Sequence, residues 1–224
     1  MTEGDQVIDA AVHRAVLLGK LDRLEESRSL LAGMREQLPG LATRFYLAEG
    51  EILLDQGRGG EALAMYLRAL NESPNNTDLL YGRSLVHERM AKTELAETDL
   101  RAILAADPDD ARAMNALGYM LTVHTQRLDE ARKLIARALE LSPGDAAVID
   151  SMGWVEFRLG KVQEARTLLE EAFNKAKDPE IAAHLGEVLW TLGDKERARA
   201  IWDAARVKDP EHPVLKETVE RLER

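Results

Sequence analysis

The sequence contains no cysteine, which excludes disulfide bonds, thiolate metal sites and a cysteine nucleophile from its 224 residues. Aromatic residues are scarce, at 4%, and no apolar run approaches the roughly 20 residues of a membrane-spanning helix. Basic residues are outnumbered, 30 against 40, and the net charge of −10 argues against nucleic acid or an anionic membrane as the partner. The hydrophobic content is an ordinary 45%, carried mainly by alanine and leucine, which indicates a globular, helical chain.

The N-terminal segment, Met1 to Asp5, is acidic and lacks the apolar stretch of a secretory signal. Two locations therefore stay open. The protein is either cytoplasmic, or it is exported by a targeting segment that lies upstream of residue 1.

A repeat with a period of about 34 residues runs through the chain. A small residue recurs at Ala15, Gly50, Ser84, Gly118, Gly153 and Gly186. A second small residue recurs at Ser27, Ala62, Ala96, Ala131, Ala165 and Ala198. Proline recurs at Pro39, Pro74, Pro108, Pro143 and Pro210. This period is typical of the tetratricopeptide helix-turn-helix repeat, and the length allows six repeats and a terminal helix.

Each of these recurring positions has a physical role in such a repeat. Helices that pack 8–10 Å apart need small side chains where they cross, so we predict that Gly153 meets Ala165 in the fifth repeat. Prolines lack an N–H and end the second helices. Gly57, Gly160 and Gly193 are expected at the inner turns in left-handed conformation. The fourth repeat carries one extra residue, which we place in its inner turn near residues 124–126.

The predicted fold is all-α, a right-handed superhelical solenoid of six tetratricopeptide repeats plus a C-terminal capping helix, in one domain over 1–224. The repeats are expected at about 5–39, 40–74, 75–108, 109–143, 144–178 and 179–210, with the capping helix at 211–223. First helices are predicted near 6–18, 41–56, 77–90, 110–123, 145–158 and 179–192. Second helices are predicted near 23–37, 60–73, 93–107, 128–142, 162–175 and 195–208.

Four short stretches point to a narrower group. They begin at Asn115, Arg127, Asp150 and Ala183, and read NALGY, RLDEA, DSMGW and AHLGE. They resemble the C-terminal repeats of proteobacterial outer-membrane tetratricopeptide lipoproteins, a group that includes an adaptor of the carboxyl-terminal processing protease of Pseudomonas. The resemblance implies a periplasmic, outer-membrane-anchored scaffold that delivers cell-wall hydrolases to a protease. The lipidated cysteine would lie upstream of residue 1.

Stacked repeats expose a concave groove lined by their first helices. The family reads this groove from three positions per repeat, and aromatic and acidic residues gather at those positions in the later repeats. Aromatic anchors dominate binding hot spots. The predicted binding residues are Tyr81, Asn115, Tyr119, Asp150, Trp154, Phe157, His184, Glu187 and Trp190. Groove and core placements are equally weighted for Phe157 and Trp190, whereas Tyr119 and Trp154 are expected to face the groove.

The family's lysine and asparagine clamp for a C-terminal carboxylate is absent, because its positions hold Leu47, Glu51, Asp78 and Gly82. The groove should therefore suit apolar or basic segments of a protein partner.

No catalytic, metal-binding or cofactor-binding residue is predicted. The five histidines are scattered through different repeats, and His87-Glu88 lacks the second histidine of a zinc-protease helix. His184 is more typical of a hydrogen-bonded structural histidine than of a metal ligand. A metal-dependent enzyme is the weakest hypothesis that we retain.

The alternative to an adaptor is a self-associating assembly or secretion scaffold of the cell envelope or cytoplasm. Apolar Val7, Ile8, Val12 and Val16 open the chain without the polar capping helix that solenoid ends need. A homo-oligomer through the N-terminal repeat would cover them.

Overall fold

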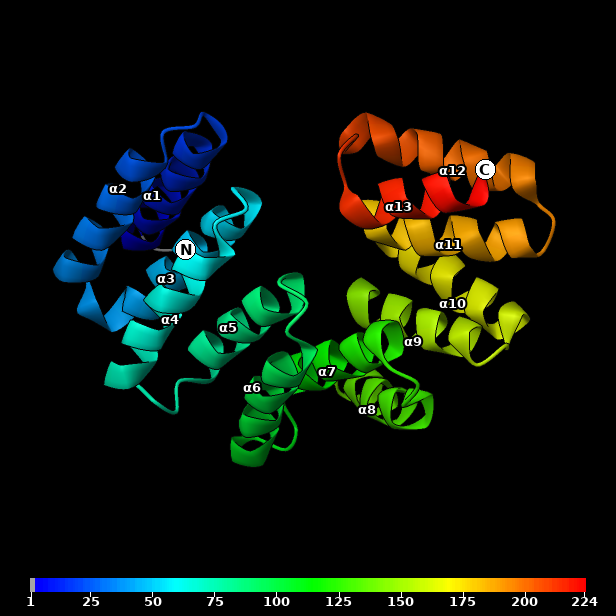
Figure 1. Cartoon of the computed structure of the whole chain (residues 1–224), viewed down its shortest axis with the longest axis horizontal. Coiled ribbons are helices and arrows are strands. Elements are labelled where there is room, and N and C mark those ends of the chain that lie inside the picture. Colours follow the sequence, from blue (N-terminus) through cyan, green and yellow to red (C-terminus); the bar gives the residue numbers. More distant parts are fainter. Residues whose placement is uncertain (1–2) are drawn as a thin grey trace. The chain divides into compact units, whose positions relative to one another are not determined.

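The computed structural model describes residues 3–224, with side chains from residue 8 onward. Over that range the chain forms thirteen α-helices and one 3-10 helix, with no strand (Figure 1). The elements are α1 (Glu3–Lys20), α2 (Leu24–Gln37), η1 (Pro39–Leu41), α3 (Ala42–Asp55), α4 (Gly59–Glu72), α5 (Thr77–Arg89), α6 (Thr93–Ala106), α7 (Ala111–His124), α8 (Leu128–Leu141), α9 (Ala146–Arg158), α10 (Val162–Lys175), α11 (Pro179–Thr191), α12 (Lys195–Lys208) and α13 (Pro213–Leu222). The predicted all-α succession of six helix-turn-helix repeats and a last helix is confirmed.

The helices fall into two compact units, Met1–Ala106 (unit 1) and Asp107–Arg224 (unit 2). Unit 1 holds the three repeats from α1 to α6. Unit 2 holds the three repeats from α7 to α12 together with α13, which packs against α11 and α12.

Polar side chains cap the N-termini of several first helices. Asn76 caps α5 by accepting a hydrogen bond from the N–H of Leu79, at 3.0 Å. Asp110, Asp145 and Asp178 cap α7, α9 and α11 in the same way. A side-chain oxygen at this position satisfies a helix N–H that has no partner within the helix.

The inner turns need a left-handed residue in five of the six repeats. The predicted glycines adopt it, with φ of +69° at Gly57, +82° at Gly160 and +88° at Gly193. Asp22 and Ala91 take the same conformation at the equivalent turns.

The fourth repeat departs from this turn. Its extra residue lengthens α7 instead of the turn, which was predicted to hold it, because α7 continues to His124. Thr125 then closes the helix. Its hydroxyl donates to the carbonyl of Leu121 at 2.7 Å and accepts the N–H of Arg127 at 3.0 Å.

The helices of a repeat approach each other where the first helix has no side chain. Atoms of Ile135 and the carbonyl oxygen of Ala131 fill the space beside Gly118, and the indole of Trp202 fills the space beside Gly186. The predicted contact of Gly153 with Ala165 stays a prediction. The atom nearest to a Cβ at Gly153 would belong to Leu169, at 2.7 Å, so the glycine also leaves room for this larger side chain one turn further along the second helix.

The core of unit 2 centres on α11, which is buried at every position from Ile181 to Leu189. Helices α9, α10, α12 and α13 surround it. Trp202 is 1% exposed and lies among Leu185, Leu189 and Val219 in the same cluster. A helix covered on all sides holds its neighbours in fixed positions, and α11 also carries several of the predicted binding residues.

The glycines at the contacts between the two helices of a repeat lead to a prediction about the free energy of unfolding. Gly186→Ala should lower the free energy of unfolding by roughly 1–3 kcal/mol, because the new Cβ would overlap the buried Trp202 ring. Gly144→Ala is the matched control, since no atom lies within 4 Å of its Cβ position. It should change stability by less than about 0.5 kcal/mol. Urea unfolding measures both, and equal effects of the two substitutions would contradict the close approach.

Candidate functional site

The predicted binding residues divide between the two units. Tyr81 lies on α5 in unit 1, and the other eight lie on α7, α9 and α11 of unit 2. Buried among these eight are Asp150, His184 and Glu187, whereas Asn115, Tyr119, Trp154, Phe157 and Trp190 are half-buried. We call these eight residues and Glu180, which lies one turn before His184, the first-helix face of unit 2.

A chain of hydrogen bonds links three successive first helices across this face. The Tyr119 hydroxyl on α7 donates to Glu180 Oε1 on α11 at 2.5 Å, and it lies 3.4 Å from His184 Nε2. His184 Nδ1 lies 2.9 Å from Asp150 Oδ2 on α9. The chain thus joins the fourth repeat to the sixth and includes the fifth. Such a link resists any change in the spacing of the three helices.

The protonation state of His184 decides whether this chain is complete. Burial of the ring disfavours its positive charge, but the carboxylates of Asp150, Glu180 and Glu187 together outweigh burial and raise the pKa of His184. A protonated imidazole donates from both nitrogens. Nδ1–H then donates to Asp150 and Nε2–H to the Tyr119 oxygen, while the tyrosine proton stays on the bond to Glu180.

Trp154 covers the histidine. Its ring stacks on the imidazole with centroids 4.1 Å apart and an interplanar angle of 17°. Phe157, on the same helix, lies 5.2 Å from Trp154 by ring centroids. The aromatic rings therefore exclude water from one side of the Asp150–His184 pair, which strengthens the electrostatic attraction between them.

The far end of the face is closed by the last helix. Arg221 on α13 donates to Glu187 Oε2 at 2.6 Å, so this buried carboxylate has a cation beside it. Phe157 and Trp190 pack against the unit 2 core. Trp190 lies 5.6 Å from Trp202 by ring centroids and is covered by Lys195 and Arg199. These contacts support the core placement of both aromatic residues.

Sequence reasoning missed Glu180 and Arg221. Glu180 lies four residues before His184, which puts both on one stripe of α11, so the helical spacing could have indicated it. Arg221 has no such signal, because its contact with Glu187 depends on how α13 packs.

Unit 1 presents a different surface. Leu47 is half-buried, Glu51 is exposed and Gly82 is buried at the positions of the absent carboxylate clamp. Gly82 packs against Tyr66, a buried residue of α4. Burial raises the pKa of Tyr66, and the carboxylates of Glu51 and Glu49 raise it further.

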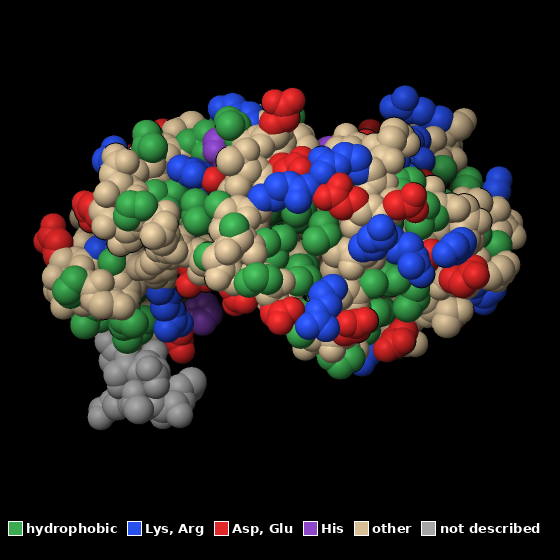
Figure 2. All heavy atoms as spheres, turned by 90° about the horizontal axis from the view of Figure 1, so that it is seen from below, with side chains coloured by type: hydrophobic (Ala, Val, Ile, Leu, Met, Phe, Trp, Pro, Cys, Tyr) green, Lys and Arg blue, Asp and Glu red, His purple; other side chains and the backbone are tan. Residues whose placement is uncertain are grey.

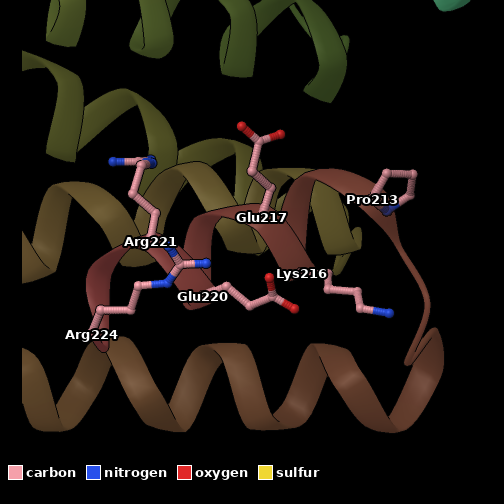
Figure 3. A pocket seen from close by; sticks show the side chains of 6 residues that line it. All are labelled: Pro213, Lys216, Glu217, Glu220, Arg221 and Arg224. Carbon is pink, nitrogen blue, oxygen red and sulfur yellow. The ribbon is translucent and has the colours of Figure 1, made fainter.

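A shallow hollow of about 480 Å³ lies along α13 and is lined by Pro213, Lys216, Glu217, Glu220, Arg221 and Arg224 (Figure 3). Its charged side chains include both signs, with three basic and two acidic residues. Basic and acidic side chains also lie next to one another over the surface shown in Figure 2. Among the described residues, no three His, Asp or Glu side chains are grouped to hold a metal ion.

Comparison with known proteins agrees with this architecture. The tetratricopeptide repeat family model matches residues 13–77, 81–146 and 151–213, and the chain belongs to this family. Proteins of the family are generally protein-interaction scaffolds. None of the described helices is long and apolar enough to cross a membrane.

Among curated proteins, the chain is 39% identical to the TPR repeat-containing protein PA4667 of Pseudomonas aeruginosa, over 98% of this chain and 37% of that protein. It is 24% identical to the type IV pilus assembly protein PilF of the same species, over 70% of this chain and 64% of that protein. The chain spans about a third of the length of the first curated relatives that it matches.

Solved structures show the same fold. A thermophilic TPR protein of Thermus thermophilus matches with a TM-score of 0.70 and 23% identity, over 81% of this chain and 98% of that chain. The APC/C Cut9–Hcn1 hetero-tetramer matches with a TM-score of 0.72 and 14% identity, over 95% of this chain and 42% of that chain.

The histidine gives a pH prediction. Because the folded-state pKa of His184 is raised above its ordinary 6.5, its contribution to stability is fully present below pH 6.5 and is lost as the pH rises through the raised value. Urea unfolding between pH 6.5 and 9 should show stability falling, with a limiting slope of roughly 1 kcal/mol per pH unit.

A second histidine does not interfere in that range. Burial lowers the pKa of His87, so it affects stability only below pH 6.5. The double variant His184→Gln/Asp150→Asn should be less stable and should lose the slope. Wild-type stability that stays constant over this range would contradict the assigned protonation.

Proposed function

We propose that the protein is a non-catalytic scaffold that binds a polypeptide on the first-helix face of unit 2, as the adaptor of a periplasmic protease. The observation that carries this proposal is the bonded chain of Tyr119, Glu180, His184 and Asp150 beneath the half-exposed Trp154. An aromatic surface that is already rigid loses little conformational entropy when a partner binds.

The choice of a protease adaptor is supported by the four stretches that resemble outer-membrane lipoproteins. Identity of 39% to a TPR repeat-containing protein of Pseudomonas aeruginosa is consistent with this choice. The proposed partners are a carboxyl-terminal processing protease and its cell-wall hydrolase substrates. The proposed location is the periplasm, with a lipid anchor that precedes residue 1.

Binding on this face predicts the effect of two substitutions. Trp154→Ala and Tyr119→Ala should each reduce capture of the purified protease by about 10-fold or more, because they remove aromatic anchors. Tyr46→Ala is the control and should leave capture unchanged. Tyr46 is a half-buried aromatic residue of unit 1, and the guanidinium of Arg35 already lies over its ring. Capture by immobilised protein measures the effect. Unchanged capture by both unit 2 variants, with folding verified by circular dichroism, would exclude this face.

Self-association through the first repeat is the second candidate, and one observation favours it. Leu17 and Leu21 are 60% and 66% exposed at the end of α1, and Val12 and Val16 are only half-buried. Val7 belongs to the same predicted patch, but its side chain lies outside the described residues. A second copy of the first repeat would cover this apolar surface.

Sedimentation velocity separates the two candidates. If the first repeat self-associates, the sedimentation coefficient rises with protein concentration, and Leu17→Glu/Leu21→Glu returns the protein to monomer. A wild-type monomer at every concentration would exclude self-association and leave the adaptor proposal intact.

A further inference from the structure

The first helix of the first repeat exposes positions that are buried in the first helices of the later repeats. Leu17 lies two residues after the small residue Ala15 and is 60% exposed. Its equivalents in the later repeats are all apolar and at most 4% exposed: Ile52, Val86, Met120, Val155 and Val188. Ala10, two turns before Leu17, is also exposed, whereas its equivalents are at most 5% exposed: Phe45, Leu79, Ala113, Val148 and Ile181. Helix α1 thus has the apolar face of an inner helix without its cover.

The preceding repeat covers this face in the later repeats. The ring of Tyr66 on α4 fills the space beside Gly82 of α5, and Ala172 of α10 lies in one cluster with Ile181 of α11. Each covering second helix is joined to the covered first helix by a short loop, so the two run antiparallel. Within the described residues no helix precedes α1. Its open face therefore matches an antiparallel helix from elsewhere.

A second copy of the chain offers such a helix by symmetry. Two identical helices that pack about a twofold axis perpendicular to them run antiparallel. The exposed residues Ala10, Arg14, Leu17 and Leu21 form one stripe of α1, because they follow at steps of 4, 3 and 4. When this stripe pairs with itself about its midpoint, Leu21 of one copy lies over Ala10 of the other, and Leu17 lies over Arg14. The small alanine leaves room for one leucine, and the arginine stem covers the other.

From this equivalence we infer that two copies of the chain associate through α1, and that α1 of each copy takes the place of a preceding second helix for the other. The inference rests on self-association, the second candidate under the proposed function, and adds the orientation and the residues in contact. Leu17 and Leu21, which are 60% and 66% exposed in the single chain, become buried in the pair. Removal of their apolar surface from water drives the association.

Disulfide cross-linking tests the orientation, because the chain has no cysteine of its own. Ala10→Cys and Leu21→Cys are made separately, mixed at a concentration at which sedimentation detects association, and mildly oxidised. A disulfide needs Cα atoms within about 7 Å, so the mixture should join position 10 of one copy to position 21 of the other. Each variant alone should cross-link little, because the two cysteines of such an antiparallel pair lie about 16 Å apart.

Matched variants complete the experiment. Val207→Cys, at an 87% exposed position of α12, is mixed with Leu21→Cys and should cross-link at least about 10-fold more slowly. Leu17→Glu, added to both α1 cysteine variants, should lower their cross-linking to that control rate, because it buries carboxylates in the apolar contact. Leu67→Glu changes an exposed leucine of α4 and should have no effect. Equal rates in all mixtures, or faster cross-linking within either α1 variant alone, would overturn the inference.

The outcome is distinguishable from failure of the self-association candidate. If sedimentation shows a monomer at every concentration, the candidate falls and the pairing of α1 falls with it. If the copies associate but no disulfide joins positions 10 and 21, the candidate stands and the pairing of α1 falls. Neither result bears on the adaptor proposal, which concerns unit 2.

Discussion

The close approach of two helices at one small residue sets the geometry of each repeat. A glycine inside a helix costs about 1 kcal/mol relative to alanine. At Gly118, Gly153 and Gly186 the missing side chain makes room for Ile135, Leu169 and Trp202, and all three are buried. Burial of a side chain of this size contributes about 1.5–3 kcal/mol, which exceeds the cost of the glycine. The first helices of successive repeats consequently lie side by side, and their outward stripes form one surface within unit 2.

That surface is held by charge as well as by packing. His184 and Asp150 are 2% and 5% exposed, and a charged group buried alone would be strongly destabilising. The two residues pair with each other across adjacent repeats, and Tyr119 extends the chain of hydrogen bonds by one more helix. Because every donor meets an acceptor only when three helices keep their spacing, the polar chain specifies one arrangement of the face. If a partner binds this face, as we propose, a surface ordered in this way loses little conformational entropy on association.

Most of the fold could be predicted because the repeat encodes it locally. The recurring small residues and prolines predicted every α-helix within about three residues at each end. Contacts between the side chains of different repeats were harder to predict from the sequence. The sequence placed Tyr119, Trp154 and His184 on one stripe, but the reach of Tyr119 to Glu180 spans two repeats and depends on side-chain length. The pairing of Glu187 with Arg221 depends on where α13 packs, and α13 lies outside the repeat pattern of about 34 residues.

The protonation of His184 tests the central claim most directly, and nitrogen-15 NMR of the imidazole ring measures it. The account predicts that the ring titrates above its ordinary pKa of 6.5, and that below this raised pKa both Nδ1 and Nε2 carry protons, with Nδ1–H bonded to Asp150. A ring that titrates at or below 6.5 would contradict the fully hydrogen-bonded chain and the rigidity of the proposed binding face.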